Sequence, residues 1–139
     1  MRRWWPRILF TSGVLLVGMA HGDDGCSCED SVFGPPTEST CPPSSTLTYE
    51  NFGKTFMESY CVECHDSNKR GADRQGAPSF HDFDTLYGIR AVHEHIDETT
   101  ASGPAATNTG MPPEGEPAPT LAERQMLGEW IACGMPGTP

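Results

Sequence analysis

The sequence predicts a small all-α domain with three main helices and long loops. Apolar residues recur at three- and four-residue steps in separate segments, and residues that favour helix N-caps precede those segments. No segment shows the alternation of apolar and polar residues that is typical of a strand. The chain has 139 residues, of which 13 are proline and 15 are glycine, so we expect extensive loops around one modest core.

The first helix is expected to follow Thr48, a good N-cap residue, and to run into Cys61. Its apolar face consists of Tyr49, Phe52, Phe56 and Tyr60. The polar residues 66–81 that come next contain two glycines and Pro78, and they predict a loop.

The second helix is expected to begin at Asp82, which can cap it. Its imperfect apolar stripe consists of Phe83, Leu86, Tyr87, Ile89, Val92 and Ile96. From about Asp97 to Pro119 there is no periodicity, and five prolines exclude a regular helix. A loop of this length in a compact domain is usually functional.

The last helix has the clearest pattern in the chain. Thr120 and Glu123 have the spacing of a capping box, and Gly134 with Pro136 ends the helix. Its expected apolar face consists of Leu121, Met126, Leu127, Trp130 and Ile131.

The N-terminal residues have the pattern of an export signal. Residues 1–7 are basic, and the apolar run 8–18 is too short to span a bilayer as a helix. Gly18 and Ala20 are small residues that suit cleavage after Ala20. We therefore expect residues 1–20 to be a signal peptide, with an uncleaved N-terminal anchor as the alternative.

The rest of the chain divides into a leader and a folded domain. Residues 21–44 are rich in Asp, Ser, Pro and Gly and predict a flexible or Cys-tethered leader, and residues 45–139 form the expected domain. The polar residues before Cys26 argue against a lipid anchor. The predicted location is the bacterial periplasm or the cell surface.

The mature chain is strongly acidic. The full sequence has a net charge of −10, and removal of residues 1–20 deletes three arginines and no acidic residue, which leaves about −13. Nucleic acids and anionic lipids need basic patches, so neither is an expected partner. Proteins with basic docking surfaces are favoured.

Residues 61–65, Cys-Val-Glu-Cys-His, form a C-x-x-C-H motif. Two thiols at this spacing can form thioethers with the two vinyl groups of a haem, and His65 can then bind the iron as proximal ligand. A thioredoxin-like dithiol would need flanking strands, but a helix is expected before Cys61. A zinc site using Cys61, Cys64, His65 and a further ligand such as His81 is another alternative, and a chance occurrence of the motif is a third.

From about Thr48 to Pro136 the sequence resembles the class I c-type cytochromes. Gly53 and Phe56 supply a small residue and an aromatic residue where the first helix of that family crosses its last. Leu127 and Trp130 lie in the last helix, where they would meet them.

Two loops extend this resemblance. Pro78 lies 13 residues beyond His65, like the family's loop proline whose carbonyl accepts a hydrogen bond from Nδ1 of the proximal histidine. Residues 110–113, Gly-Met-Pro-Pro, resemble the family's distal-ligand loop, with Met111 as the sulfur donor.

Met111 competes with other possible ligands. These are Met57, Met126, Met135, His81, His93 and His95. Met57 and Met126 are expected to pack within helices, and Met135 lies in the terminal tail. His93 and His95 should point to different faces of a helix, and His81 should lie on the proximal side. Met111 alone is followed by two prolines, which stiffen its backbone.

The resemblance implies a cytochrome c-like domain wrapped around one covalent haem c. Cys61 and Cys64 would hold the haem, and His65 and Met111 would be its axial ligands. Because both axial positions are then filled, the implied function is one-electron transfer rather than catalysis. The implied partners are redox proteins, among them a membrane-bound electron-transfer complex. The alternatives are a haem enzyme or gas sensor with a displaceable sixth ligand, and a zinc-binding module.

Four cysteines remain outside the motif, namely Cys26, Cys28, Cys41 and Cys133, and three pairings are open. In the cytochrome c fold the first and last helices cross, so a leader folded back along the crossing would bring Cys41 to Cys133. The resemblance therefore favours a Cys41–Cys133 disulfide. The alternative is that Cys133 is a buried free thiol beside Trp130.

Overall fold

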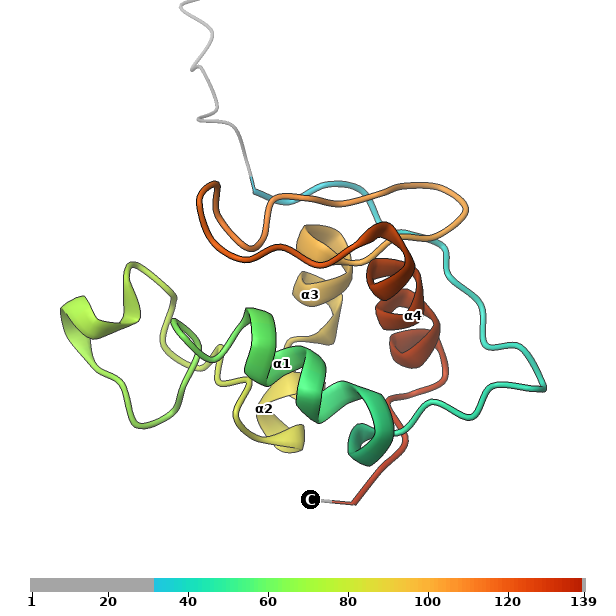
Figure 1. Cartoon of the computed structure of the whole chain (residues 1–139), viewed down its shortest axis with the longest axis horizontal. Coiled ribbons are helices and arrows are strands. Elements are labelled where there is room, and N and C mark those ends of the chain that lie inside the picture. The colour runs from blue at the N-terminus through green and yellow to red at the C-terminus, as the bar shows by residue number, and fades with distance from the viewer. Residues whose placement is uncertain (1–31, 139) are drawn as a thin grey trace, which may run out of the picture.

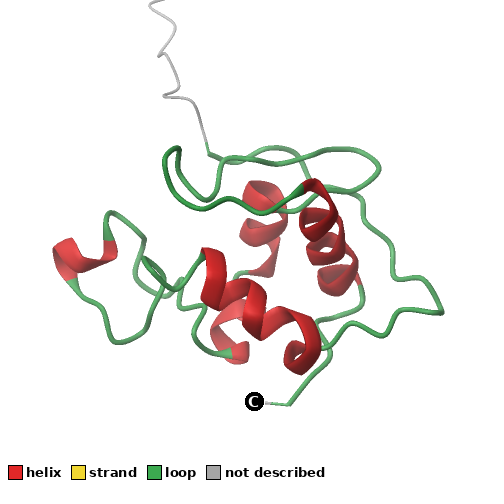
Figure 2. Ribbon diagram, in the orientation of Figure 1, coloured by secondary structure: helices red, strands yellow, loops and turns green. Residues whose placement is uncertain are grey.

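The computed structural model describes residues 32–138, in which short helices alternate with long loops (Figures 1 and 2). No β-strand occurs within this range, although an isolated antiparallel bridge joins Ser102 to Thr107. The predicted all-α class is confirmed for these residues. The expected signal peptide, Cys26 and Cys28 lie outside the described residues.

The first helix begins with a π-helical turn, Tyr49–Gly53, and continues as α1, Lys54–Tyr60. Thr48 is its N-cap, as predicted, because its side chain accepts a hydrogen bond from the backbone of Asn51. The Asn51 side chain accepts in return from the backbone of Thr48, which completes a capping box. Cys61 lies at the C-terminal end of α1.

The predicted second helix begins and ends later than expected and is divided in two. Helix α2 spans Leu86–Ala91 and α3 spans His93–Thr100, with Val92 outside helical geometry between them. Thr85 caps α2 by accepting from Gly88 N, so the predicted cap at Asp82 was wrong. The carboxylate of Asp82 instead accepts from Arg74 at 2.8 Å.

The predicted loop 66–81 contains a 3₁₀ turn, Gly71–Arg74, and protrudes from the helices beside α1 and α2 (Figure 1). The second predicted loop begins later than expected, because α3 continues to Thr100. This loop lies across the ends of α3 and α4 (Figure 1).

The last helix, α4, spans Leu121–Ala132, and its predicted capping box is present. Thr120 N donates to the Glu123 carboxylate at 2.8 Å, and Glu123 N donates to Thr120 Oγ at 3.3 Å. Leu127 and Trp130 are fully buried. Leu121 and Met126 are 56% and 38% exposed, so their predicted packing role was wrong.

The first and last helices meet at a close contact between Gly53 and Trp130. A Cβ atom on Gly53 would lie 2.5 Å from the indole ring, so this position accommodates only glycine without a shift of the neighbouring ring. The rings of Phe52 and Trp130 pack edge to face, with their centroids 6.1 Å apart. The Tyr60 hydroxyl donates a hydrogen bond to the Glu123 carboxylate at 3.0 Å. The core around this crossing consists of Phe52, Phe56, Met57, Phe83, Leu86, Ile89, Ile96, Ala101, Leu127, Trp130 and Met135.

A disulfide joins Cys41 to Cys133, as favoured from the sequence. The preceding leader residues are packed against the domain, because Thr37 is 1% exposed and donates through both N and Oγ to the Asp97 carboxylate. Of the two alternatives for the leader, the described part agrees with a tethered segment, because Cys41 and a carboxylate on α3 both anchor it.

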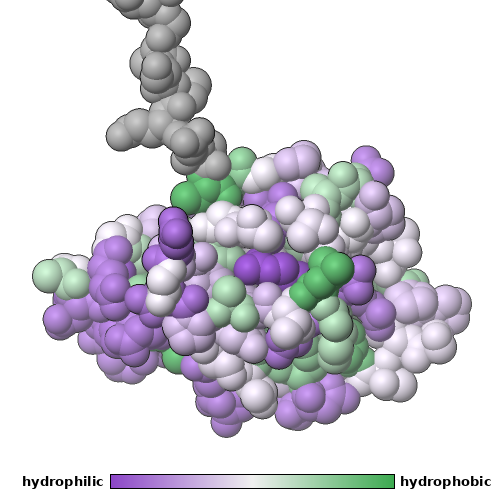
Figure 3. All heavy atoms as spheres, turned by 45° about the horizontal axis from the view of Figure 1, so that its top comes forward, coloured by the Kyte–Doolittle hydropathy of each residue, from purple (hydrophilic) through white to green (hydrophobic). Residues whose placement is uncertain are grey.

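Within residues 32–138 no helix has the length and apolar character needed to cross a membrane. The face seen in Figure 3 is largely polar, and its strongly apolar residues are scattered.

Candidate functional site

The C-x-x-C-H residues form a tight turn that continues from the C-terminal end of α1. The backbone N–H groups of Cys64 and His65 both donate to the Cys61 carbonyl, at 3.1 and 2.9 Å. Cys61 and Cys64 are free thiols, although the Cys41–Cys133 pair of the same chain is oxidised. The turn therefore presents two thiols and an imidazole within five residues.

Both thiols resist ionisation. Burial raises the pKa of Cys61 to about 12, although the Arg124 cation acts in the opposite direction. Burial also raises the pKa of Cys64, and the carboxylates of Glu116 and Glu63 add to this effect. Dithiol oxidoreductases depend on a cysteine with a lowered pKa, because the thiolate is the nucleophile. The two cysteines therefore do not have the electrostatics of a thiol–disulfide exchange site.

His65 is held through both its side chain and its backbone. Its Nδ1 lies 3.0 Å from the His81 carbonyl oxygen, and its own carbonyl accepts from Phe83 N at 2.7 Å. The ring of Phe83 stacks on the imidazole with centroids 4.4 Å apart. A carbonyl can only accept, so Nδ1 carries the proton and Nε2 has the free lone pair that binds a metal.

The environment of His65 also favours its neutral form. Burial lowers the pKa of the imidazole, with the neighbouring His81 and Arg74 acting in the same direction. The hydrogen bond to the His81 carbonyl and the charge of Asp82 oppose this shift. A neutral imidazole with a fixed tautomer is the form that acts as a metal ligand.

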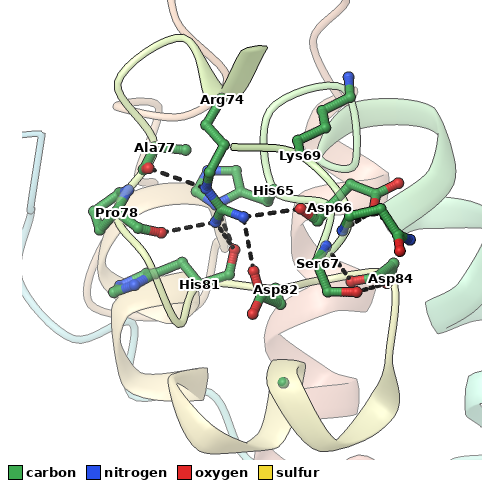
Figure 4. A network of polar contacts seen from close by, with 12 residues as sticks. His65, Asp66, Ser67, Lys69, Arg74, Ala77, Pro78, His81, Asp82 and Asp84 are labelled. Carbon is green, nitrogen blue, oxygen red and sulfur yellow. Dashed lines mark hydrogen bonds and ion pairs between the residues drawn. The ribbon is translucent and has the colours of Figure 1, made fainter. Parts of the chain in front are cut away.

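The acceptor for His65 is His81, not Pro78, so the predicted role of Pro78 was wrong. The Pro78 carbonyl accepts from Arg74 Nη2 at 2.7 Å instead (Figure 4). The loop closes around the Arg74 guanidinium, which places the carbonyl of His81, three residues later, against the imidazole.

Met111 lies in the loop before α4 and is half-buried. Its backbone is fixed at both ends, because Met111 N donates to Thr99 O at 2.9 Å and its carbonyl accepts from Arg124 Nη1 at 3.1 Å. The charge of the same guanidinium opposes the effect of burial on the pKa of the Cys61 thiol. The structure records no hydrogen bond or ring contact between Met111 and His65.

Arg124 is 5% exposed and has no carboxylate within ion-pair distance among residues 32–138. Its Nη1 donates to three backbone carbonyls, those of Thr100, Asn108 and Met111. The arginine thereby ties the end of α3 and the Met111 loop to α4. Sequence reasoning did not identify this role, because any residue can provide a backbone carbonyl as an acceptor.

The rival histidines have other contacts. His81 Nε2 and His95 Nδ1 share a hydrogen bond at 3.0 Å, and His93 Nδ1 bonds to the Arg90 carbonyl at 2.9 Å. His93 and His95 thus point to different partners, as expected from their spacing. His81 lies in the loop beside His65, as also expected.

The zinc alternative has no assembled ligand set in the described part of the chain. No group of three or more His, Cys, Asp or Glu side chains within residues 32–138 is placed to hold a metal ion. The His81 imidazole, the expected fourth ligand, is directed to His95.

Comparisons with family models, curated proteins and solved structures gave no match for this chain.

Proposed function

We propose that this protein is an exported c-type cytochrome that carries one covalent haem and transfers single electrons. The observation that carries the proposal is the turn at the end of α1. It holds Cys61 and Cys64 as thiols and fixes the tautomer of His65, with Nε2 free, in a chain whose other described cysteines are disulfide-bonded.

The donor set fits a haem of type c. Thioether formation consumes two protonated thiols, and the raised pKa values of Cys61 and Cys64 keep both thiols protonated at neutral pH. Iron takes imidazole and thioether ligands, and His65 and Met111 supply one of each. The backbone of each ligand is hydrogen-bonded on the protein side, which limits the ordering cost of ligation.

In this proposal Cys61 and Cys64 hold the haem, and His65 and Met111 are the axial ligands. Bound haem supplies a one-electron couple between ferrous and ferric iron. The chain's own contribution is to orient His65 through the His81 carbonyl and to fix the Met111 segment through Arg124. With both axial positions occupied by protein ligands, no position is open to a substrate, which favours a carrier over an enzyme.

The fold supports a cytochrome c-like domain. The resemblance assigns Gly53 of the first helix and Trp130 of the last helix to the crossing of these helices, and the two residues are in close contact. The C-x-x-C-H turn directly follows the first of these helices, and the Met111 loop directly precedes the last.

Export and an acidic surface complete the proposal. Disulfides such as Cys41–Cys133 are typical of oxidising compartments, among them the periplasm. The export signal predicted for the N-terminal residues directs a chain to the same compartment. The net charge of −10 favours redox partners with basic docking surfaces.

The proposal is tested by spectroelectrochemical titration of the protein exported by a bacterial host that attaches haem c. We expect a haem spectrum that titrates reversibly with a single one-electron transition. Carbon monoxide should not change the spectrum of the reduced protein at neutral pH. Rapid binding of carbon monoxide would favour the sensor or enzyme alternative. A protein without a haem spectrum would refute the proposal.

A further inference from the structure

Arg74 lies at the centre of the loop that follows the C-x-x-C-H turn. Its side chain is 7% exposed, and all three guanidinium nitrogens are used (Figure 4). Its five acceptors are the carbonyls of Ala77 (3.2 Å), Asp66 (2.8 Å), Pro78 (2.7 Å) and His81 (3.0 Å) and the carboxylate of Asp82 (2.8 Å). The loop thus folds around a single side chain.

One of these acceptors is shared with the proposed proximal ligand. The His81 carbonyl accepts from Arg74 Nη2 and from His65 Nδ1, each at 3.0 Å. Figure 4 shows the guanidinium and the imidazole converging on this oxygen. A carbonyl oxygen has two lone pairs, so the His81 carbonyl can accept both hydrogen bonds at once.

We propose that Arg74 is the positioning residue of the His65 imidazole. Its guanidinium holds the loop so that the His81 carbonyl meets the Nδ1–H of His65, and it shares that carbonyl with the imidazole. This inference rests on the proposed function, because the orientation and basicity of His65 matter when it is an iron ligand.

The direction of the effect follows from the hydrogen bonds. A strong acceptor at Nδ1 increases the electron density that an imidazole gives to its metal. By holding the His81 carbonyl against the Nδ1–H of His65, Arg74 maintains that acceptor, so it makes His65 a better donor and favours the ferric state. Because the Asp82 carboxylate pairs with Arg74 at 2.8 Å, the local charge is balanced and the effect acts through the shared carbonyl.

A matched control lies four residues away in the same loop. Arg70 is exposed and donates to the carbonyls of Ser67 and Lys69, not to that of His81. Arg70→Gln therefore removes the same charge as Arg74→Gln but leaves the shared carbonyl intact. Arg74→Lys keeps the charge, but a single ammonium nitrogen cannot reach acceptors on all sides.

The first measurement is hydrogen exchange of the Phe83 amide, which donates to the His65 carbonyl at 2.7 Å. We expect exchange to be roughly tenfold faster in Arg74→Gln and in Arg74→Lys, the effect of losing about one hydrogen bond, and unchanged in Arg70→Gln. This measurement needs no haem, so it tests the positioning role even if the protein is exported without colour, an outcome that would refute the proposed function alone.

The second measurement uses the haem-loaded protein. In Arg74→Gln the Nδ1 proton of His65, followed by NMR in the ferrous state, should exchange faster with solvent. The reduction potential should rise above that of Arg70→Gln, because the weakened hydrogen bond makes His65 a poorer donor to the iron. Wild-type behaviour of Arg74→Lys in both measurements would show that charge alone suffices and would overturn the proposal. Equal changes in Arg70→Gln and Arg74→Gln would overturn it as well. If Arg74→Gln is not recovered folded, the lysine variant decides.

Discussion

Replacement of Cys41 and Cys133 by serine should remove most of the stabilisation that comes from closing a long loop. The bond joins residues 92 positions apart, for which the chain-entropy model gives about 4.6 kcal/mol at 25 °C. Cys41 is exposed and Cys133 is half-buried, so serine should cost little packing at either site. The loss should therefore reflect the greater freedom of the unfolded chain.

The same number predicts a change in thermal stability. A domain of the described length has an unfolding entropy of roughly 0.22 kcal/mol/K, so the loss corresponds to a fall in Tm of about 20 °C. Circular dichroism during heating and urea titration would measure both quantities on the exported protein. The urea m-value should also rise, because the unfolded chain without the bond exposes more surface.

The two single variants provide the internal control. If Cys41 and Cys133 are bonded to each other, each single serine variant should match the double variant within about 0.5 kcal/mol, because the effects of the two replacements are not additive. A double variant within about 1 kcal/mol of the wild type would refute the reasoning. Single variants of unequal stability would indicate pairing with Cys26 or Cys28 instead.

Four further predictions follow from the site and the core. Met111→Ala should lower the reduction potential and abolish the weak long-wavelength absorption band of methionine-ligated ferric haem. Met126→Leu, at a position that is 38% exposed, should change neither property. If Met111→Ala leaves the band unaffected, His93 or His95 becomes the candidate for the sixth ligand. Trp130→Ala should destabilise the fold by about 3–5 kcal/mol in urea titration, because the side chain is fully buried at the helix crossing; a loss below about 1 kcal/mol would show that the crossing is not part of the core. Hydrogen bonds from Thr138 lower the pKa of Glu50 to about 2. The stabilising contact of the C-terminal tail should therefore be complete above about pH 4.5 and be lost as the pH falls towards 2. An NMR titration of Glu50 with its midpoint near the usual value of a glutamate would contradict this. Electron transfer with a basic partner should slow steeply as ionic strength rises, and a rate independent of salt, measured by stopped flow, would assign the acidic surface to solubility alone.

Local sequence signals predicted the parts of the fold that depend on neighbouring residues. Thr48 and the Thr120–Glu123 pair cap their helices as expected, because a capping box depends on residues three positions apart. The Cys41–Cys133 bond was reached through the resemblance, which placed the two chain segments near each other.

Some of the predictions that were wrong concern side chains whose hydrogen-bond partners come from other parts of the chain. Asp82 is a good N-cap residue by type, but its carboxylate is bound to Arg74, and Thr85 caps α2 in its place. The leader residue Thr37 is anchored by Asp97 from 60 positions away, a contact that the sequence pattern does not indicate. Such pairings depend on tertiary structure, which propensity and periodicity do not contain.

The supporting contacts of the candidate site were also beyond sequence reasoning. The acceptor for His65 is a backbone carbonyl, and any residue at position 81 could provide one. Arg74 and Arg124 donate mostly to backbone carbonyls, which any residue can provide, so the sequence does not mark these contacts. The C-x-x-C-H residues were found because their chemistry lies in their side chains.

Covalent attachment of haem to Cys61 and Cys64 is the property on which the proposed function depends most. Acid–organic extraction of the exported protein, followed by mass mapping of the peptide that contains residues 61–65, measures it directly. We predict that the colour stays with the polypeptide and that this peptide carries the mass of one haem, with both cysteines protected from alkylation. Extraction of all colour, or alkylation of Cys61 and Cys64 in the folded protein, would contradict the proposal.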